Sequence, residues 1–232
     1  MSAFTHLFMG KIVLITGATS GFGKSAAYKF AANGYDLIIN GRRTERLDKM
    51  ATELESKYNI AVLTLPFDVR EEKAVFAAID SLPENWKAID VLVNNAGIGY
   101  FGAIEESEEA EVRRMFEINF FGLAHMTNEV LPHMRKQRSG HILNVASIGG
   151  LRSFPAVGFY NATKYAVDGL SEALMKEVAP LGIKVTVICP SGFRTDWAGR
   201  SANNTNIKIE DYKDTAWKNM GDLRGYSGNQ PG

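Results

Sequence analysis

The chain has 232 residues, a length that suits one α/β domain burying about 70 to 75% of the surface that its unfolded form exposes. Its 26 basic and 26 acidic residues give a formal net charge of zero, which argues against nucleic acid as a partner. The N-terminus lacks a signal-peptide pattern, and no apolar run approaches the roughly 18 residues of a membrane span. The single cysteine, Cys189, cannot form an internal disulfide, and a small buried side chain is its simplest interpretation. We therefore expect a soluble cytoplasmic protein with no membrane partner.

Short apolar runs rich in Val, Ile and Leu alternate along the chain with longer stretches of helical character. This alternation is typical of βαβ units around a parallel sheet that is buried on both faces. The predicted strands are Lys11–Thr16, Asp36–Asn40, Ala61–Pro66, Ile89–Asn94, His141–Ala146 and Lys184–Cys189. The predicted helices are Gly23–Asn33, Thr44–Tyr58, Glu71–Ser81, Glu108–Arg138 and Gly158–Leu181. The fourth helix should break or bend near Gly122 and again near Pro132.

Right-handed crossovers would place these helices on both sides of the sheet. This predicts a single doubly wound α/β domain of the Rossmann type, with strand order 3-2-1-4-5-6. We expect residues 1–200 to form the dinucleotide-binding and catalytic domain. After Arg200 the composition becomes polar, so residues 201–232 are predicted to be a substrate loop or lid of the same domain.

The first strand runs directly into the glycine-rich turn Thr16-Gly17-Ala18-Thr19-Ser20-Gly21-Phe22-Gly23, which opens the first helix. Glycines permit a tight turn there, and they let the backbone approach a pyrophosphate at the helix N-terminus. A plain turn is the alternative, because a glycine-rich turn by itself is weak evidence. The spacing Gly-x-x-x-Gly-x-Gly resembles the TGxxxGxG motif of the short-chain dehydrogenase/reductase family. The resemblance implies cofactor contacts at Gly17, Thr19, Ser20, Gly21, Phe22 and Gly23.

Two further segments match the family. Asn94-Asn95-Ala96-Gly97, after the fourth strand, resembles the family's NNAG motif, which implies that Asn95, Ala96 and Gly97 lie beside the adenosine half of the cofactor. Asp68 and Val69 follow the third strand, where the family uses an acidic or amide side chain to bind adenine. Capping of the helix Glu71–Ser81 is the alternative role of Asp68, since Asp commonly caps helices.

The end of the second strand bears on which dinucleotide is used. An acidic residue at this position hydrogen-bonds the ribose 2′-hydroxyl of NAD, whereas an arginine nearby accommodates a 2′-phosphate. Here the sequence continues with Gly41, Arg42 and Arg43, and it offers no acidic residue. A guanidinium can make two charge-assisted hydrogen bonds to phosphate oxygens. We therefore expect NADP(H), bound by Arg42 and Arg43, although both could instead be solvated residues at a helix start.

Tyr160 and Lys164 stand four positions apart at the start of a predicted helix, so their side chains lie on one face. Ser147 lies at the end of the fifth predicted strand, and the spacing Ser-x12-Tyr-x3-Lys resembles the family's active-site signature. Asn119 matches the fourth member of that signature. The resemblance implies that Asn119, Ser147, Tyr160 and Lys164 are catalytic. The alternative makes Tyr160 a core residue, Lys164 a solvated one and Ser147 a helix cap.

The chemistry explains these residue types. A phenol with a pKa of about 10 is a poor base at neutral pH unless its ionised form is stabilised. An ammonium at roughly 4 Å would supply about 4 kcal/mol at an effective dielectric of about 20, so we expect Lys164 to lower the pKa of Tyr160. Ser147 would donate a hydrogen bond to the substrate oxygen, where negative charge develops as hydride arrives. Asn119 would hold a backbone kink and a water that links Lys164 to solvent.

Near the end of the matched region, Pro190 and Thr195 resemble the family's proline-glycine motif and its threonine at the nicotinamide amide. Ser191 stands where the family has glycine, and Gly192 follows one position later. The histidines show no metal-ligand spacing, so no metal is expected and all four are interpreted as structural or solvated: His6, His125, His133 and His141.

These matches predict an oxidoreductase that transfers hydride between NADP(H) and a small carbonyl or secondary alcohol substrate. The alternative is a dinucleotide-binding sensor, which would not need the proton-transfer residues. Family relatives commonly form homodimers or homotetramers, and we expect association here through the two longest helices, which carry apolar Phe120, Phe121, Leu123 and Met126.

The tail departs most from the family. It contains no apolar run for a seventh strand, so the sheet should stop at six strands, with an exposed edge at Lys184–Cys189. We therefore expect the chain to be a fragment of a longer protein. We also expect Trp197, Tyr212 or Trp217 to close over the nicotinamide as part of a lid.

Overall fold

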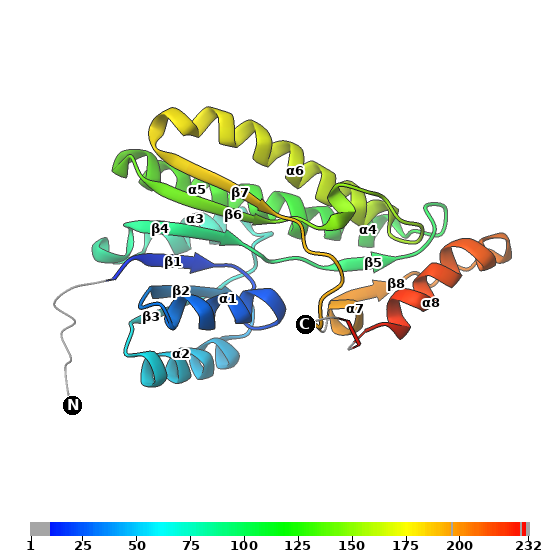
Figure 1. Ribbon diagram of the computed structural model, residues 1–232, viewed down its shortest axis with the longest axis horizontal. Coiled ribbons are helices and arrows are strands. Elements are labelled where there is room, and N and C mark those ends of the chain that lie inside the picture. Colours follow the sequence, from blue (N-terminus) through cyan, green and yellow to red (C-terminus); the bar gives the residue numbers. More distant parts are fainter. Residues whose placement is uncertain (1–9, 196, 228, 231–232) are drawn as a thin grey trace.

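The six predicted apolar runs form the six parallel strands of one sheet (Figure 1). In the computed structural model, which describes residues 10–195, 197–227 and 229–230, these strands are β1 (Ile12–Ile15), β2 (Asp36–Gly41), β3 (Val62–Pro66), β4 (Ile89–Asn94), β6 (Gly140–Val145) and β7 (Ile183–Ile188). Their order is β3-β2-β1-β4-β6-β7, which is the predicted order when the strands of this sheet are counted alone. Among the described residues, no further strand pairs with the outer side of β7.

Helices cover both faces of this sheet. They are α1 (Gly21–Ala31), α2 (Thr44–Tyr58), α3 (Glu72–Asp80), α4 (Glu109–Phe116), α5 (Gly122–Gln137) and α6 (Gly158–Val178), with short 3-10 turns at Glu84–Trp86, Ile148–Gly150 and Ala179–Leu181. Successive side chains of a strand point to opposite faces, so a strand that is apolar throughout packs on both sides. Val13 and Ile15 of β1 pack with α1 and α2, while Ile12 and Leu14 lie in the cluster formed with α3, α5 and α6. Figure 1 shows these two groups of helices on opposite sides of the sheet.

The long helix predicted over Glu108–Arg138 is interrupted where a break was expected. A π-helical turn, Glu117–Phe121, separates α4 from α5, which begins at Gly122. Each turn of a π-helix contains more residues than a turn of an α-helix. Asn119 lies within this π-helical turn, and the Asn119 side chain is buried. At Pro132, in contrast, α5 continues to Gln137, so the helix does not end there.

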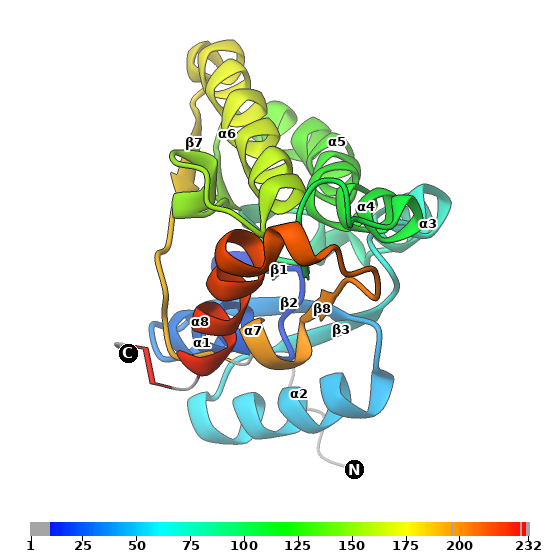
Figure 2. The same cartoon turned by 90° about the vertical axis from the view of Figure 1, so that its right-hand side faces the viewer.

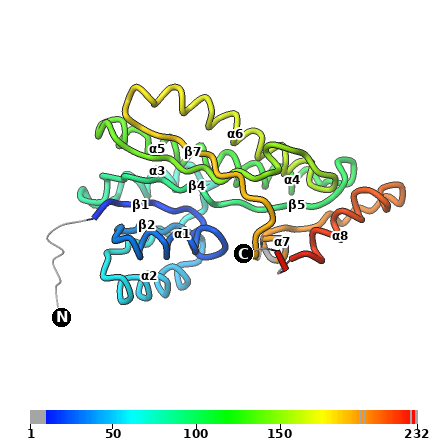
Figure 3. Tube along the Cα trace, viewed as in Figure 1, coloured from blue at the N-terminus to red at the C-terminus, as the bar shows by residue number. Residues whose placement is uncertain are grey.

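The C-terminal segment is more regular than predicted. It contains α7 (Trp197–Arg200), β8 (Ala202–Asn204), a 3-10 turn at Glu210–Tyr212, a π-helical turn at Lys213–Trp217 and α8 (Lys218–Gly225). β8 pairs in parallel with β5 (Gly99–Phe101), which lies just after β4. Figure 2 shows this segment in front of the sheet, and Figure 3 shows it to the right, beyond the carboxyl ends of the strands. The expectation of a loop over residues 201–232 is therefore wrong for most of this stretch.

A buried carboxylate holds that segment in place. The Glu106 side chain is fully buried, and it accepts hydrogen bonds from the Ala103 N–H at 3.0 Å, the Ile209 N–H at 2.8 Å and the Trp217 indole N–H at 2.7 Å. Burial opposes ionisation, but these donors and the charge of Lys208 outweigh it and hold the pKa of Glu106 below its ordinary value. Two of these partners lie 103 and 111 positions away along the chain, so no local sequence pattern could reveal them.

No helix in the described ranges combines the length and apolar character needed to cross a membrane.

Candidate active site

A cavity of about 690 Å³ opens at the carboxyl ends of the strands, between them and the C-terminal segment. Seventeen of the nineteen predicted site residues line it: Gly17, Thr19, Ser20, Gly21, Phe22, Arg42, Arg43, Asp68, Val69, Asn95, Ala96, Gly97, Ser147, Tyr160, Lys164, Pro190 and Thr195. The two others, Gly23 and Asn119, are not part of its wall. The cavity is therefore formed by segments from almost the whole length of the chain.

The glycine-rich turn forms one wall of the cavity. Gly17 and Gly21 have φ angles of +62° and +50°, a region that residues with side chains rarely adopt. Gly23 acts differently, because a Cβ atom there would lie 2.4 Å from the Asn95 amide nitrogen. The first turn of α1 carries no acidic residue, and Ser20 makes no side-chain capping bond. A bare helix N-terminus of this kind suits a bound phosphate.

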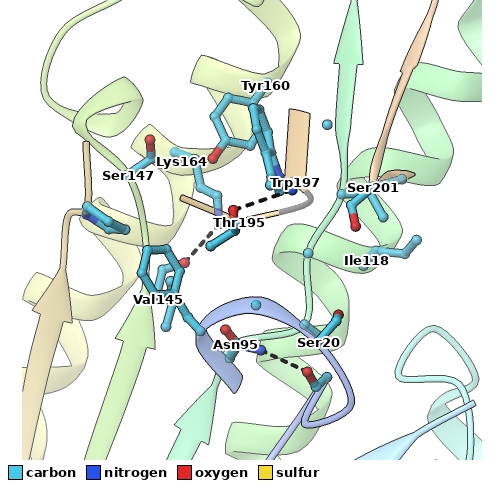
Figure 4. Close-up of a pocket in the computed structure, with 18 of the residues that line it drawn as sticks. Ser20, Asn95, Ile118, Val145, Ser147, Tyr160, Lys164, Thr195, Trp197 and Ser201 are labelled. Atoms are coloured by element: carbon cyan, nitrogen blue, oxygen red, sulfur yellow. Dashed lines mark hydrogen bonds between the residues drawn. The ribbon is translucent and has the colours of Figure 1, made fainter. Parts of the chain in front are cut away.

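The Thr16 hydroxyl ties this turn to the segment after β4. It accepts hydrogen bonds from the Asn95 N–H at 2.9 Å and the Ala96 N–H at 3.0 Å. In return, the Asn95 amide donates to the Thr16 and Gly17 carbonyls, and Figure 4 shows the Asn95 side chain below the cavity. Sequence reasoning named Asn95 as a cofactor neighbour and missed Thr16, although its place just before the glycine turn was the available signal.

The predicted adenosine end contains one more arginine than expected. Arg70 makes hydrogen bonds to Asp68 from Nη2 at 2.9 Å and from Nε at 3.1 Å, and Arg42 Nη1 lies 3.9 Å from the same carboxylate. Burial alone would raise the pKa of Asp68, but these hydrogen bonds and charges lower it. The N-cap of α3 is Glu71, so the alternative that Asp68 caps this helix is wrong.

Ser147, Tyr160 and Lys164 meet at the centre of the cavity (Figure 4). Tyr160 and Lys164 lie one turn apart on α6, and Ser147 follows β6, where its oxygen accepts a hydrogen bond from the Gly149 N–H at 3.0 Å. Ser147 therefore caps a short 3-10 turn and still has its own hydroxyl hydrogen to donate. Capping, the alternative role of Ser147, therefore does not exclude the predicted donation of a hydrogen bond to a substrate oxygen.

The pKa values of Tyr160 and Lys164 differ from the expectation. Burial raises the pKa of Tyr160 to about 12, and a hydrogen bond with Ser147 opposes the shift. Burial also lowers the pKa of Lys164 to about 8. The Lys164 Nζ atom donates to the Val145 carbonyl at 2.8 Å and lies 5.7 Å from the centre of the Tyr160 ring. The expected lowering of the Tyr160 pKa by Lys164 is wrong for this state, because burial disfavours the ionised phenol and the Lys164 ammonium donates to the Val145 carbonyl instead.

Asn119 lies behind the cavity. Its amide oxygen accepts from the Ile98 N–H at 2.8 Å, while its nitrogen donates to the Ile98 carbonyl at 3.0 Å and to the Thr163 hydroxyl at 3.1 Å. These bonds connect the segment after β4 to the helix that carries Tyr160 and Lys164. Asn119 is thus a positioning residue in this structure, and Thr163 is a partner that the sequence did not reveal.

The other end of the cavity is bounded by the C-terminal segment. Trp197, Asn219, Leu223 and Tyr226 belong to its wall. Tyr212 and Trp217, the other two aromatic residues of the expected lid, do not line the cavity: their polar atoms donate to Glu105 and Glu106. Of the three predicted lid residues, only Trp197 faces the site.

The remaining sequence predictions concern residues outside the cavity. Cys189 packs at the edge of an apolar cluster, where it is half-buried and not fully buried as expected. His125 contacts the Val69 carbonyl at 3.2 Å and His141 the Thr186 hydroxyl at 2.8 Å. No cluster of potential metal ligands occurs in the part of the chain that the structure describes, and His6 lies outside it.

Comparison with known proteins gives one family. The model described as short chain dehydrogenase matches residues 11–206. The chain is 39% identical to 3-ketodihydrosphingosine reductase from Bacteroides thetaiotaomicron over 212 residues, covering 90% of this chain and 74% of the relative. It superimposes on a short-chain dehydrogenase from Streptomyces avermitilis with a TM-score of 0.86 at 37% identity, covering 100% of this chain and 80% of the other. For a short chain dehydrogenase/reductase from Burkholderia phymatum in complex with NAD, the TM-score is 0.83 at 30% identity, with coverage of 97% and 82%.

The chain belongs to the short-chain dehydrogenase family. It is therefore an oxidoreductase of this family, which uses a nicotinamide dinucleotide and acts on small molecules. These matches do not support the alternative of a dinucleotide-binding sensor.

The buried Lys164 has a measurable effect on stability. A fall in its pKa from 10.5 to about 8 disfavours the charged folded state by about 3 kcal/mol. Between these two values the unfolded chain binds more protons, so this contribution to stability should rise as the pH rises.

We predict that the unfolding free energy of the wild type, relative to Lys164→Met, increases by about 2 to 3 kcal/mol between pH 7 and pH 10. Urea denaturation of both proteins without dinucleotide measures it, and the difference cancels the titrating groups that do not interact with Lys164. A pH-independent difference would show that Lys164 titrates normally.

Proposed function

We propose that this protein transfers hydride between NADP(H) and a carbonyl or secondary alcohol, with Tyr160 as the proton donor and acceptor. The observation that carries this proposal is the meeting of Ser147, Tyr160 and Lys164 in the same cavity as the glycine-rich turn. A dinucleotide that lies along the turn with its phosphates at the start of α1 would reach these side chains with its other end.

The protein's own residues suit the proton transfer. In the direction of carbonyl reduction, a phenol whose pKa is about 12 stays protonated at neutral pH and can act as the acid. When substrate binds, Ser147 turns its one hydroxyl hydrogen from Tyr160 to the substrate oxygen, where negative charge develops. Lys164 must be protonated to attract the developing phenolate, and the pKa of about 8 leaves it mostly charged at neutral pH. The bound dinucleotide supplies the hydride.

The residues present fit such a cofactor. The turn at Gly17 and Gly21 offers backbone without side chains, and the start of α1 carries no negative charge. We assign Thr19, Ser20 and Phe22 to the phosphate end, and Asp68, Val69, Asn95, Ala96 and Gly97 to the adenosine end. Lys164 would hold the nicotinamide ribose, with Pro190 and Thr195 at the nicotinamide.

A solved relative is in complex with NAD, so similarity to the family does not decide between NAD(H) and NADP(H). The proposed preference for NADP(H) is therefore argued from residues of this chain. Arg42 and Arg43 line the cavity at the end of β2. The Arg42 side chain is 61% exposed, so its guanidinium can turn from Asp68 to a 2′-phosphate at little cost. No acidic side chain at this position in the sequence would repel that phosphate.

We expect NADP(H) to bind at least about ten times more tightly than NAD(H), a difference of about 1.4 kcal/mol, and Arg42→Ala to remove this preference. Calorimetric titration of both dinucleotides measures it. Arg46→Ala, an exposed arginine on α2 that does not line the cavity, is the matched control. Equal affinities in the wild type would contradict the proposal.

For the proton transfer, we expect Tyr160→Phe to reduce turnover by about two to four orders of magnitude while dinucleotide binding stays nearly unchanged. Lys164→Ala should impair both. Tyr165→Phe, on the exposed side of the same helix, serves as the control. Near-normal turnover of a folded Tyr160→Phe protein would exclude the proposed acid and base.

Residues 201–232 complete the substrate end in this proposal. The described part of α8 supplies Asn219 and Leu223 to the cavity wall, and the Asn219 amide donates to the Pro155 carbonyl at 2.7 Å. This bond ties α8 to the loop that precedes α6. We therefore assign the segment to substrate binding within the same domain.

We also propose that two copies of the chain associate through α4 and α6. A shallow groove there is lined by Val112, Phe116, Phe121 and Phe159, and Phe121 is 43% exposed. Leu123 and Met126 are buried in the core and take no part, which corrects the expectation from sequence. A second copy of the chain is the partner that we assign to this groove, because a two-fold interface uses the same surface of both copies.

Light scattering at micromolar concentration should give the mass of a dimer or larger oligomer, and Phe121→Glu should shift it toward the monomer. Phe76→Glu is the control, because Phe76 is 54% exposed on α3 and remote in sequence from the groove residues. A monomeric wild type would contradict the association.

A further inference from the structure

Trp197 packs directly against the tyrosine that we assign to proton transfer. The centres of the Trp197 and Tyr160 rings are 4.9 Å apart, with the planes tilted by 53°. Figure 4 shows the indole beside the phenol, on the side away from Ser147. The Trp197 backbone N–H donates to the Thr195 hydroxyl at 3.3 Å, which links the start of α7 to the predicted nicotinamide end.

Several contacts hold this indole in one position. Phe101, which is fully buried, meets it edge to face at a centroid distance of 5.7 Å. The Arg224 guanidinium lies 4.8 Å from the Phe101 ring and donates to the Gly199 and Ala202 carbonyls. Trp197 therefore lies between the rings of Tyr160 and Phe101, and Arg224 in turn contacts the Phe101 ring.

The backbone beneath the indole is shaped to accept it. A Cβ atom on Gly99 would lie 2.6 Å from Trp197 Cζ2 and 2.8 Å from the Ala202 Cβ. Any side chain at position 99 would thus displace the indole. Gly99 lies on β5, where it pairs with Ala202 of β8, and the missing side chain at position 99 leaves room for the indole of Trp197 on α7.

A rigid indole at this place limits one side of the substrate. Any group attached to the reacting carbon on the Trp197 side must fit between the Tyr160 hydroxyl and the indole. The rest of this end offers apolar surface from Phe154, Val157 and Leu223, which can receive a longer chain. One methylene too many in a closed pocket reduces specificity by about 10 to 200-fold.

We propose that Trp197 determines the substrate range, so that the site takes carbonyl compounds with one small and one longer apolar substituent. This inference rests on the proposed function. It assigns Trp197 a role in selecting the substrate and none in the proton transfer itself.

The experiment compares two isomers, hexyl methyl ketone and butyl propyl ketone, which have the same composition and differ in the smaller substituent. The wild type should reduce the methyl ketone with at least about tenfold higher kcat/KM. Trp197→Ala should remove most of this preference, by raising kcat/KM for butyl propyl ketone, and Trp197→Phe should have a smaller effect. Tyr212→Phe is the matched control, because Tyr212 lies in the same C-terminal segment but does not line the cavity, and its hydroxyl donates only to the exposed Glu105; it should keep the wild-type ratio.

Thermal shift measurements with each ketone and saturating NADP⁺ provide a second readout that does not require turnover. An unchanged ratio of kcat/KM in Trp197→Ala, with both ketones reduced, would overturn the role of Trp197 and leave the proposed function standing. Reduction of neither ketone by any variant would count against the proposed function for this substrate class. In that case, equal thermal shifts from both ketones in the wild type would also overturn the size limit at Trp197.

Discussion

The structure depends on the meeting of β1 and β4 at the centre of a parallel sheet. The chain leaves these two strands toward opposite sides, and the crevice between the departing segments is where such sheets bind ligands. The Thr16 hydroxyl closes the bottom of this crevice by accepting hydrogen bonds from the Asn95 and Ala96 N–H groups. These bonds hold the glycine-rich turn and the NNAG segment at a constant separation. The other walls of the cavity lie around these two segments.

Around this crevice the protein places charged and polar groups at a cost to its stability. Lys164 is buried with one carbonyl partner, and its ammonium is disfavoured by desolvation. Such a residue contributes little to folding, and an apolar side chain of the same size would fill the space. Its position next to Tyr160 is explained by chemistry, since a cation at this place can stabilise a phenolate as it forms and neutralise charge on a bound ligand.

The C-terminal segment is held in place by a different kind of interaction from the sheet. Where the core of the sheet uses apolar packing, the C-terminal segment is anchored by the buried Glu106 carboxylate and its three N–H donors. Carboxylates that accept several hydrogen bonds are strongly directional, so they fix the orientation of a polar segment that could not bury much apolar surface. The ring contacts of Trp197 with Phe101 and with Tyr160 then connect this segment to α6.

The sequence by itself determined the sheet, the strand order and seventeen of the residues that line the cavity. These follow from local signals: apolar runs bury strands on both faces, glycines at Gly17 and Gly21 permit the turn, and Tyr160 and Lys164 share a helix face because they are four positions apart. Tertiary structure alone decided the rest. The fold of the C-terminal segment depends on Glu106, two of whose partners lie 103 and 111 positions away, and the contact of Gly99 with Trp197 joins β5 to α7, which no periodicity marks. The pKa of Tyr160 also required the structure, because desolvation depends on everything packed around a group and not on its neighbours in sequence.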